Sequence, residues 1–163
     1  MAKWIYSNLS FVLGVDISSD NIHNQLDGVC ARYIKAKKKH KIVPKALFVV
    51  GKSECNIRDG TAFNTVKDKS IVDATFGNGP KDINILGKGV YNNYGIATNG
   101  FNVSSCQFAL HYFFGNKKSL LSFVKNVVEC TKINGYFIAT CYDGKTVFNE
   151  LKNKNKGESM IIN

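Results

Sequence analysis

Four short runs of strand-forming residues constrain the fold of this chain more than any other feature. They cover residues 11–15, 46–50, 101–106 and 136–140, and polar or turn residues bound them. The first two are continuous apolar runs, as expected for strands buried on both faces of a parallel sheet. The segments between the runs have mostly helical character. Strands that alternate with helices predict parallel βαβ units, and therefore an α/β fold with an open parallel sheet.

The connecting segments predict helices and one long loop. A helix that begins near Ser18, Ser19 or Asp20 should end in the lysine cluster at 35–41, because cations suit the negative end of the helix dipole. Its apolar face would consist of Ile22, Leu26, Val29, Cys30, Tyr33 and Ile34. Further helices are expected at about 66–75, 118–132 and 146–153. The segment 77–100 is rich in glycine and asparagine, which predicts a long loop insertion.

Length and composition indicate a single globular domain. The chain has 163 residues, of which 44% are hydrophobic, so it can bury a core of its own. No apolar run approaches the roughly 20 residues that span a bilayer. The amino end has no long apolar segment before a cleavage site, so we expect no membrane contact and no secretion.

The five cysteines argue against disulfides and metal sites. Their number is odd, their spacings are wide, and no CxxC motif occurs. Cys30, Cys106 and Cys130 lie in apolar patterns and are expected to be small core residues. We therefore expect no bound metal and a reducing compartment such as the cytoplasm.

The charge favours a polyanionic partner. The formal net charge is +10, from 22 basic and 12 acidic residues. Nucleic acid is the first candidate partner, although a basic balance can also serve solubility alone. The lysine cluster is the densest group of positive charges in the sequence. It fits either a solvated helix end or a patch that follows the phosphates of a nucleic acid. It consists of Lys35, Lys37, Lys38, Lys39, His40 and Lys41, followed by Lys45.

Polar residues that follow the strands are the candidates for a site, because ligands of open α/β sheets bind outside the carboxyl ends of the strands. These positions are Asp16, 51–54, 107–112 and 141–144. Asp16 ends the first run, where an acidic residue can accept hydrogen bonds from the ribose of a nucleotide cofactor. It could equally cap the helix that follows.

The block 106–114 carries four aromatic residues and a histidine just past a strand end. It could be an aromatic part of the core that contains one histidine with its hydrogen bonds satisfied. Gln107 and His111 among the aromatics also fit a slot for a planar heterocycle. Aromatic rings would stack on the face of such a base, while the polar side chains address its edges.

The sequence SCQFALHYFF over 105–114 resembles the SCQFxxHYxF signature of mRNA cap guanine-N7 methyltransferases. The resemblance covers about 3–150, and the QFxxHY part is its most specific portion. The sequences NIRDG over 56–60 and TCYDG over 140–144 resemble the branch found in large DNA viruses. Other matching stretches are Lys3-Trp4, 15–18, Arg32-Tyr33, 126–130 and 134–140.

This resemblance implies a Rossmann-like fold dependent on S-adenosylmethionine, with a parallel central sheet. The matching residues for the methyl donor are Asp16, at its ribose, together with Ser53, Gln107, Phe108 and Tyr112. Ser53 lies beside Lys52, which takes the place of an aspartate that often contacts the adenine. On the cap side, the matching residues are His111 at the guanine and Lys3 and Arg32 at the phosphates. Tyr142 replaces a proline and could stack on the guanine.

The implied reaction is transfer of a methyl group to N7 of the cap guanine of RNA. That nitrogen has a free lone pair and no proton, so no general base is required. Catalysis would come from in-line positioning and a favourable electrostatic environment. We therefore expect no acid–base catalyst, and His111 and Tyr112 are the candidates for positioning.

The family's glycine-rich loop is absent, since the sequence begins with Lys3-Trp4 where that loop would end. We therefore expect 1–163 to be one partial domain that lacks the first strand and is truncated at both ends. Its partners would be capped RNA and the rest of a viral capping enzyme, in a cytoplasmic viral factory or a virion. The alternative is a non-catalytic basic α/β remnant that binds RNA or a capping subunit. Methylation of another substrate is disfavoured by the pair His111 and Tyr112.

Overall fold

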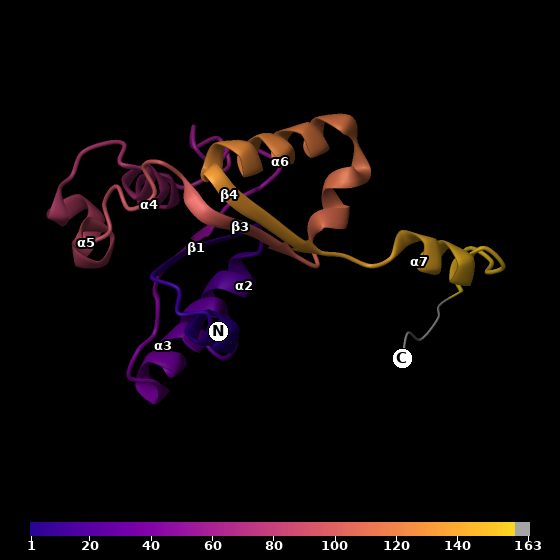
Figure 1. The fold of residues 1–163 in the computed structure, drawn as a ribbon, viewed down its shortest axis with the longest axis horizontal. Coiled ribbons are helices and arrows are strands. Elements are labelled where there is room, and N and C mark those ends of the chain that lie inside the picture. The colour runs from indigo at the N-terminus through magenta and orange to yellow at the C-terminus, as the bar shows by residue number, and fades with distance from the viewer. Residues whose placement is uncertain (159–163) are drawn as a thin grey trace.

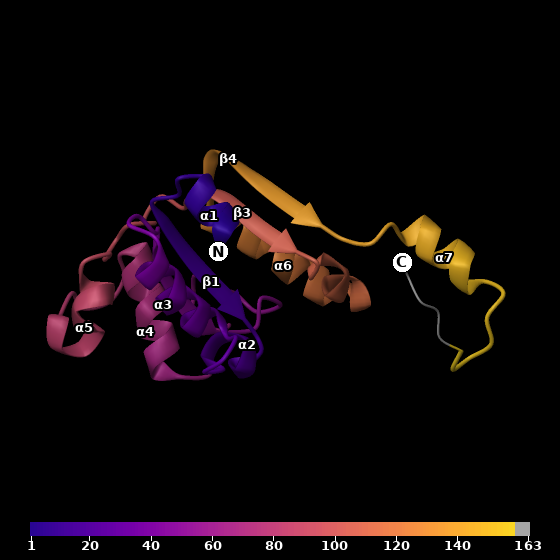
Figure 2. The same cartoon turned by 90° about the horizontal axis from the view of Figure 1, so that it is seen from below.

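The computed structural model describes residues 1–158, which form the mixed α/β fold of Figures 1 and 2. In chain order the elements are α1 (Ala2–Tyr6), β1 (Phe11–Asp16), α2 (Ser19–His23), α3 (Val29–Lys39), β2 (Lys45–Val50), α4 (Val66–Phe76), α5 (Ile83–Tyr91), β3 (Phe101–Gln107), the 3-10 helix η1 (Leu110–Gly115), α6 (Lys117–Cys130), β4 (Thr131–Thr140) and α7 (Gly144–Leu151). Among these residues, no helix combines the length and apolar character needed to cross a bilayer.

The strands are parallel, as predicted, but they do not form one continuous sheet within the described residues. β1 pairs with β2, and β3 pairs with β4, so the ladders define two separate two-stranded sheets. In Figure 2, β1 and the β3–β4 pair point in similar directions, with their arrowheads toward the same side. The carboxyl ends of both pairs therefore lie on one side of the molecule.

One face of the β1–β2 pair is covered by α1 and α3. Trp4 of α1 stacks on Phe48 of β2 with ring centroids 6.2 Å apart, and Tyr33 of α3 meets the same ring edge-on at 5.7 Å. Gly14 of β1 lies beside this ring, and a Cβ there would be only 2.8 Å from the Phe48 ring. Glycine at position 14 therefore makes room for the ring that anchors both helices.

The opposite face of this pair forms the core, which both sheets share. Val49 of β2 is fully buried against Val72 and Phe76 of α4. Phe101 of β3 packs against the same cluster, with its ring 5.9 Å from that of Phe76 and 6.2 Å from that of Phe11 in β1. Burial of apolar surface thus joins two sheets that share no ladder.

The β3–β4 pair is covered on one face by α6 (Figure 1). Phe123 of α6 meets Phe137 of β4 edge-on at 6.0 Å and stacks on Phe113 of η1 at 4.0 Å. Side chains alternate along a strand, so Tyr136 and Ile138 point to the other face, and both are exposed. This second face carries the polar residues of the candidate site described below.

The helix expected from about residue 18 to the lysine cluster is two helices, which corrects that prediction. α2 ends at His23 and α3 begins at Val29. A Cβ on Gly28 would lie 2.6 Å from the backbone of Asn24, so this tight turn needs glycine. Because of the break, Leu26 is exposed in the turn and does not belong to an apolar helix face.

The segment 77–100 is not one long loop, because it contains α5. It is also held to the core: Gly95 N–H donates to the Ala74 carbonyl at 2.7 Å and Ala97 N–H donates to the Thr75 carbonyl at 3.0 Å. The Tyr94 hydroxyl donates to the carbonyls of Gly77 and Gly79. Backbone contacts with α4 thus order a segment whose composition suggested a loop.

Asn134 and Gly135, which directly precede the predicted strand 136–140, lie inside β4 at an irregularity of the ladder. Phe101 pairs with Thr131, whereas Val103 pairs with Tyr136, so β4 bulges between them. Asn134 has a φ of 64°, a left-handed value that asparagine tolerates better than most residues. The strand predicted from residue 136 therefore begins earlier, at Thr131, and continues through the bulge.

The cysteines behave mainly as packing residues. Cys130 is buried, and burial raises the pKa of its thiol to about 11. Cys30 and Cys106 are half-buried rather than fully in the core, and burial also raises the pKa of each. All five cysteines are free, as the sequence predicted.

A buried amide ties the loop after β2 to α6. The Asn126 side chain is 3% exposed and donates to the carbonyls of Ser53, at 2.9 Å, and Cys55, at 2.6 Å. Its own oxygen accepts from the Ile57 N–H at 2.8 Å. The amide therefore satisfies three backbone groups of a segment that we call the 53–59 strap. This strap connects the β1–β2 sheet to the helix that covers β3–β4.

We expect the substitution Asn126→Ala to lower the free energy of unfolding by about 2–4 kcal/mol, because it leaves three partly buried backbone groups without their partner. Urea denaturation followed by circular dichroism measures this change. Asn153→Ala, at an exposed position, is the matched control and should change stability by less than about 0.5 kcal/mol. Equal effects of the two substitutions would contradict the role given to Asn126.

Candidate functional site

Two of the predicted site residues lie at the carboxyl ends of neighbouring strands. Asp16 ends β1 opposite Val50, the last residue of β2, and Ser53 follows in the strap. One carboxylate oxygen of Asp16 accepts from the Ser18 N–H at 2.8 Å, and the other accepts from the Asn21 side chain at 3.2 Å. Ser18 is the residue that caps α2, so the capping role considered for Asp16 belongs to Ser18.

The carboxylate of Asp16 keeps capacity for a ligand. Each of its oxygens accepts one hydrogen bond within the described chain, whereas an ionised carboxylate offers about four acceptor sites. The group is half-buried, and the two bonds fix its orientation. An oriented carboxylate with free lone pairs at a strand end suits ligand hydroxyl groups.

A hydrogen-bonded network orders the corresponding end of the second sheet. Gln107 and Thr140 are the last residues of β3 and β4 and lie opposite each other. The Thr140 hydroxyl donates to the Gln107 side-chain oxygen at 2.9 Å, and the Gln107 amide donates to the Ser105 hydroxyl at 2.9 Å. Gln107 is thereby held on the face that α6 leaves open.

Phe108, the next residue, has strained backbone. Its φ is 54°, in the left-handed region that phenylalanine rarely adopts. Its N–H donates to both the carbonyl and the hydroxyl of Thr140, at 2.9 and 3.1 Å. The ring is 61% exposed, so core packing does not explain the strain. Such strain is characteristic of ligand sites, where the surrounding structure maintains it.

The aromatic block forms an exposed ledge beside this network. The Phe108 ring lies 6.1 Å from that of Tyr142, and the His111 ring lies 4.2 Å from Tyr112 and 6.2 Å from Tyr142. Tyr112 is 73% and Tyr142 is 60% exposed. Most of the block is therefore exposed, whereas Phe113 packs on Phe123 of α6, so the core alternative considered from the sequence holds for Phe113 alone among its aromatic rings. We call Phe108, His111, Tyr112 and Tyr142 the aromatic ledge.

The two predicted phosphate-binding residues lie on the helices that cover one face of β1–β2. Lys3 is exposed on α1 and Arg32 is exposed on α3, each next to the aromatic residue that anchors its helix on Phe48. No hydrogen bond or ion pair found among residues 1–158 joins either side chain to the aromatic ledge. The structure thus groups the other candidate residues into two strand-end sets, one with Asp16 and Ser53 and one with Gln107 and the aromatic ledge, while the two cations lie on α1 and α3.

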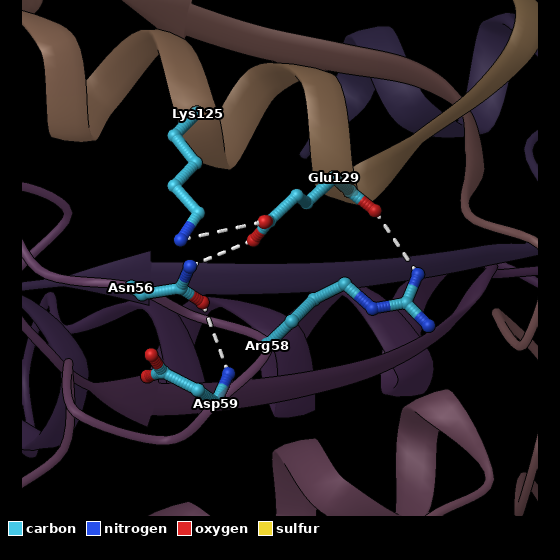
Figure 3. Close-up of a pocket in the computed structure, with 5 residues that line it drawn as sticks. All are labelled: Asn56, Arg58, Asp59, Lys125 and Glu129. Atoms are coloured by element: carbon cyan, nitrogen blue, oxygen red, sulfur yellow. Dashed lines mark hydrogen bonds and ion pairs between the residues drawn. The ribbon is translucent and has the colours of Figure 1, made fainter.

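A separate concavity on the surface is lined by Asn56, Arg58, Asp59, Lys125 and Glu129 (Figure 3). Its groups are largely paired with one another. Glu129 accepts from Asn56 at 2.7 Å, lies 3.6 Å from the Lys125 ammonium, and its carbonyl accepts from Arg58 at 3.0 Å. These contacts extend the bonds of Asn126, so the concavity is part of the strap's attachment to α6.

Sequence reasoning missed Thr140 and Ser105 as site residues. Both lie inside predicted strands, and their hydroxyls became relevant only through the register of β3 on β4. A threonine at the last position of the 136–140 run was the available signal. Among residues 1–158, no three histidine, cysteine, aspartate or glutamate side chains lie together as a metal site would require.

Fold and candidate site together define an α/β protein in which polar and aromatic groups follow the carboxyl ends of parallel strands, the edge where ligands of open α/β sheets bind. The sequence matches the family described as mRNA (guanine-N(7))-methyltransferase domain over residues 1–163. This chain belongs to that family. The family uses S-adenosylmethionine as methyl donor and acts on capped mRNA.

Individual relatives agree with this assignment. The chain is 28% identical over 156 residues to a probable mRNA-capping enzyme of Acanthamoeba polyphaga mimivirus. This match covers 96% of this chain and 12% of the relative. It is 38% and 40% identical over 58 residues to mRNA cap guanine-N(7) methyltransferases of Caenorhabditis briggsae and Caenorhabditis elegans. Each of these matches covers 36% of this chain and 15% of the relative. No solved structure matches the chain significantly.

We expect Phe108→Asn to leave the free energy of unfolding unchanged or to raise it by up to about 1 kcal/mol. Asparagine relieves the left-handed strain, and the lost ring is mostly exposed. Phe114→Asn is the control, because Phe114 is also an exposed phenylalanine of the block but has no positive φ. Chemical denaturation compares the two variants. A loss above about 1 kcal/mol for Phe108→Asn would show that the ring serves stability.

Proposed function

We propose that this domain takes part in transfer of a methyl group from S-adenosylmethionine to N7 of the guanine in an RNA cap. The observation that carries the proposal is the arrangement at the strand ends. A fixed carboxylate ends β1, a fixed amide ends β3, and the aromatic ledge follows β3 and β4 on the same side of the molecule. The chain spans 12–15% of the curated relatives it matches, so the activity belongs to the proposal.

The residues at this edge fit the methyl donor. Asp16 would accept from the ribose hydroxyls, since its carboxylate retains lone pairs. Ser53 would line the adenosine side, where the Asn126 amide holds its carbonyl. Gln107, Phe108 and Tyr112 would line the methionine side. S-adenosylmethionine would supply the electrophilic methyl group.

The guanine would bind at the aromatic ledge. Rings of Tyr112 and Tyr142 offer faces for stacking, while the His111 imidazole offers a hydrogen bond to a base edge. N7 carries no proton, so the chain needs no general base there. Orientation of the two ligands would account for catalysis, with His111 and Tyr112 as positioning residues. Lys3 and Arg32 would meet the phosphates of the cap.

We also propose that the domain has a Rossmann-like sheet, in which a further strand lies between β1 and β3. Trp4 and Tyr33 pack on the same ring of β2, so α1 and α3 lie on one face. Crossovers between parallel strands are right-handed. A strand joined to the amino end of α1 would therefore lie on the side of β1 away from β2. The Phe11–Phe101 stack brings β3 toward that same edge.

Two substitutions should distinguish binding of the methyl donor from binding of the cap. We expect Asp16→Asn to weaken S-adenosylhomocysteine binding about tenfold, because an amide replaces one ribose acceptor with a donor; tenfold corresponds to about 1.4 kcal/mol. His111→Ala should weaken binding of the cap dinucleotide GpppG by a similar factor. Isothermal titration calorimetry measures both affinities, and each variant serves as the control for the other ligand.

The same titrations should be run on the chain extended at its amino end by the segment that precedes the match in the mimivirus relative. Binding of S-adenosylhomocysteine only by the extended chain would support a methyltransferase domain completed by that segment. Failure of both forms to bind it would contradict the proposal. If both forms then still bound RNA, the chain would be the non-catalytic basic domain considered from the sequence.

A further inference from the structure

The positive charge of this chain is concentrated in one segment. Residues 28–53 contain eight lysine and arginine side chains and no aspartate or glutamate, a formal +8 against +10 for the whole chain. Most of this segment is α3 and the turn that leads into β2. The side chains of Arg32, Lys35, Lys38, Lys39, Lys41 and Lys45 are all exposed.

Helical geometry aligns part of this charge into a stripe. Arg32, Lys35, Lys38 and Lys39 are linked by three- and four-residue spacings, so they lie on one side of α3. At 1.5 Å per residue the stripe is about 10 Å long on the helix. Lys41 and Lys45 continue it beyond the helix end.

The stripe leads from one end of the strands to the other. α3 follows β1 and precedes the parallel strand β2, so it runs back from the carboxyl ends of the strands toward their amino ends. Arg32 therefore lies nearer the edge that carries Asp16, whereas Lys45 begins β2 at the opposite edge. In Figure 1 the end of α3 that leads into β2 lies at the lower periphery, away from the segment that precedes α6.

Helix stability alone does not account for this arrangement. Lysines in the last turn interact favourably with the helix dipole, but that effect fades beyond one turn. It does not explain Arg32 and Lys35 upstream or Lys45 in the strand. Lys35 and Lys39 are like charges four residues apart, which costs a few tenths of a kcal/mol. Among residues 1–158 the one ion pair found is Lys125–Glu129, so no carboxylate neutralises the stripe.

One contact shows that the stripe is partly ordered before any ligand binds. The Lys35 ammonium donates to the Leu26 carbonyl at 2.6 Å, which fixes its direction and leaves further N–H donors free. Compact ammonium groups at regular spacing suit the phosphates of a single-stranded nucleic acid.

We propose that Lys35, Lys38, Lys39, Lys41 and Lys45 form a binding stripe for the sugar–phosphate backbone of the RNA downstream of its cap. The stripe deepens the proposed function, because it gives the body of the substrate RNA a path that starts at Arg32. It is distinct from the aromatic ledge and requires neither base recognition nor the methyl donor. RNA binding there depends on salt and not on sequence.

The test is fluorescence anisotropy with an uncapped, labelled 20-nucleotide RNA, using the triple variant Lys35→Gln, Lys38→Gln, Lys39→Gln. We expect about tenfold weaker binding at 50 mM salt. The slope of log affinity against log salt should fall in magnitude by about two, since each lost phosphate contact contributes about 0.7 for single strands. Circular dichroism should show an unchanged fold, since these side chains are exposed.

The matched control is Lys152→Gln, Lys154→Gln, Lys156→Gln, which removes the same charge from exposed lysines outside α3. We expect less than a twofold change. Equal losses in both triple variants would overturn the stripe, as would absence of RNA binding by the parent chain. Competition by polyglutamate as effective as that of RNA would assign the stripe to an acidic protein and overturn the RNA assignment.

The cap dinucleotide GpppG separates this proposal from the function proposed above. Unchanged GpppG affinity in the Lys35, Lys38, Lys39 variant, with RNA binding lost, supports both. A different result would separate the two proposals. If the parent chain does not bind GpppG, either alone or extended at its amino end, and the triple variant loses the RNA binding of the parent, the stripe stands and cap recognition fails. A variant that loses GpppG and keeps RNA binding overturns the stripe alone.

Discussion

The buried amide of Asn126 is the interaction on which the arrangement of this domain most depends. The β1–β2 and β3–β4 pairs share no backbone ladder within residues 1–158, so hydrogen bonding between strands cannot hold them together. The apolar core around Phe76 and Phe101 attracts the two pairs, but hydrophobic contact is not directional. Three hydrogen bonds between the Asn126 side chain and the 53–59 strap, two donated and one accepted by Asn126, fix the relative orientation of the two pairs.

This attachment matters for the site because the two sheets carry different halves of it. Asp16 and Ser53 follow from the first pair of strands, whereas Gln107 and the aromatic ledge follow from the second. Asn126 holds the carbonyl of Ser53 directly, and it lies on α6, the helix that covers β4. The same side chain thus fixes a candidate cofactor residue and the separation of the two halves. The contacts of Arg58 with Glu129 and Thr98 strengthen that junction.

Features set by local chemistry could be predicted from the sequence, and features set by register or close contact could not. The parallel strands followed from short strand-forming runs, and α4 begins at Val66, as predicted, after the capping residue Thr65. The break before α3 was missed, because apolar spacing continued through Gly28 while backbone crowding required a turn. Asp16 and Gln107 were located by their places at strand ends. The bond between Gln107 and Thr140 depends on a register shifted by a bulge, which no local pattern reveals.

The exposure of the aromatic ledge explains why the junction must be stiff. Rings that are 60–73% exposed gain most of their binding energy only when a ligand covers them, since each aromatic side chain can bury roughly 150–250 Å². Methyl transfer in line needs the donor and the guanine held to within about 0.5 Å of the productive geometry. In the proposed function the donor contacts residues of both strand pairs and the guanine lies on the second pair, so a small rotation between the pairs would exceed that tolerance. In the proposed function, covering the ledge would therefore supply affinity, while the bonds of Asn126 would supply alignment.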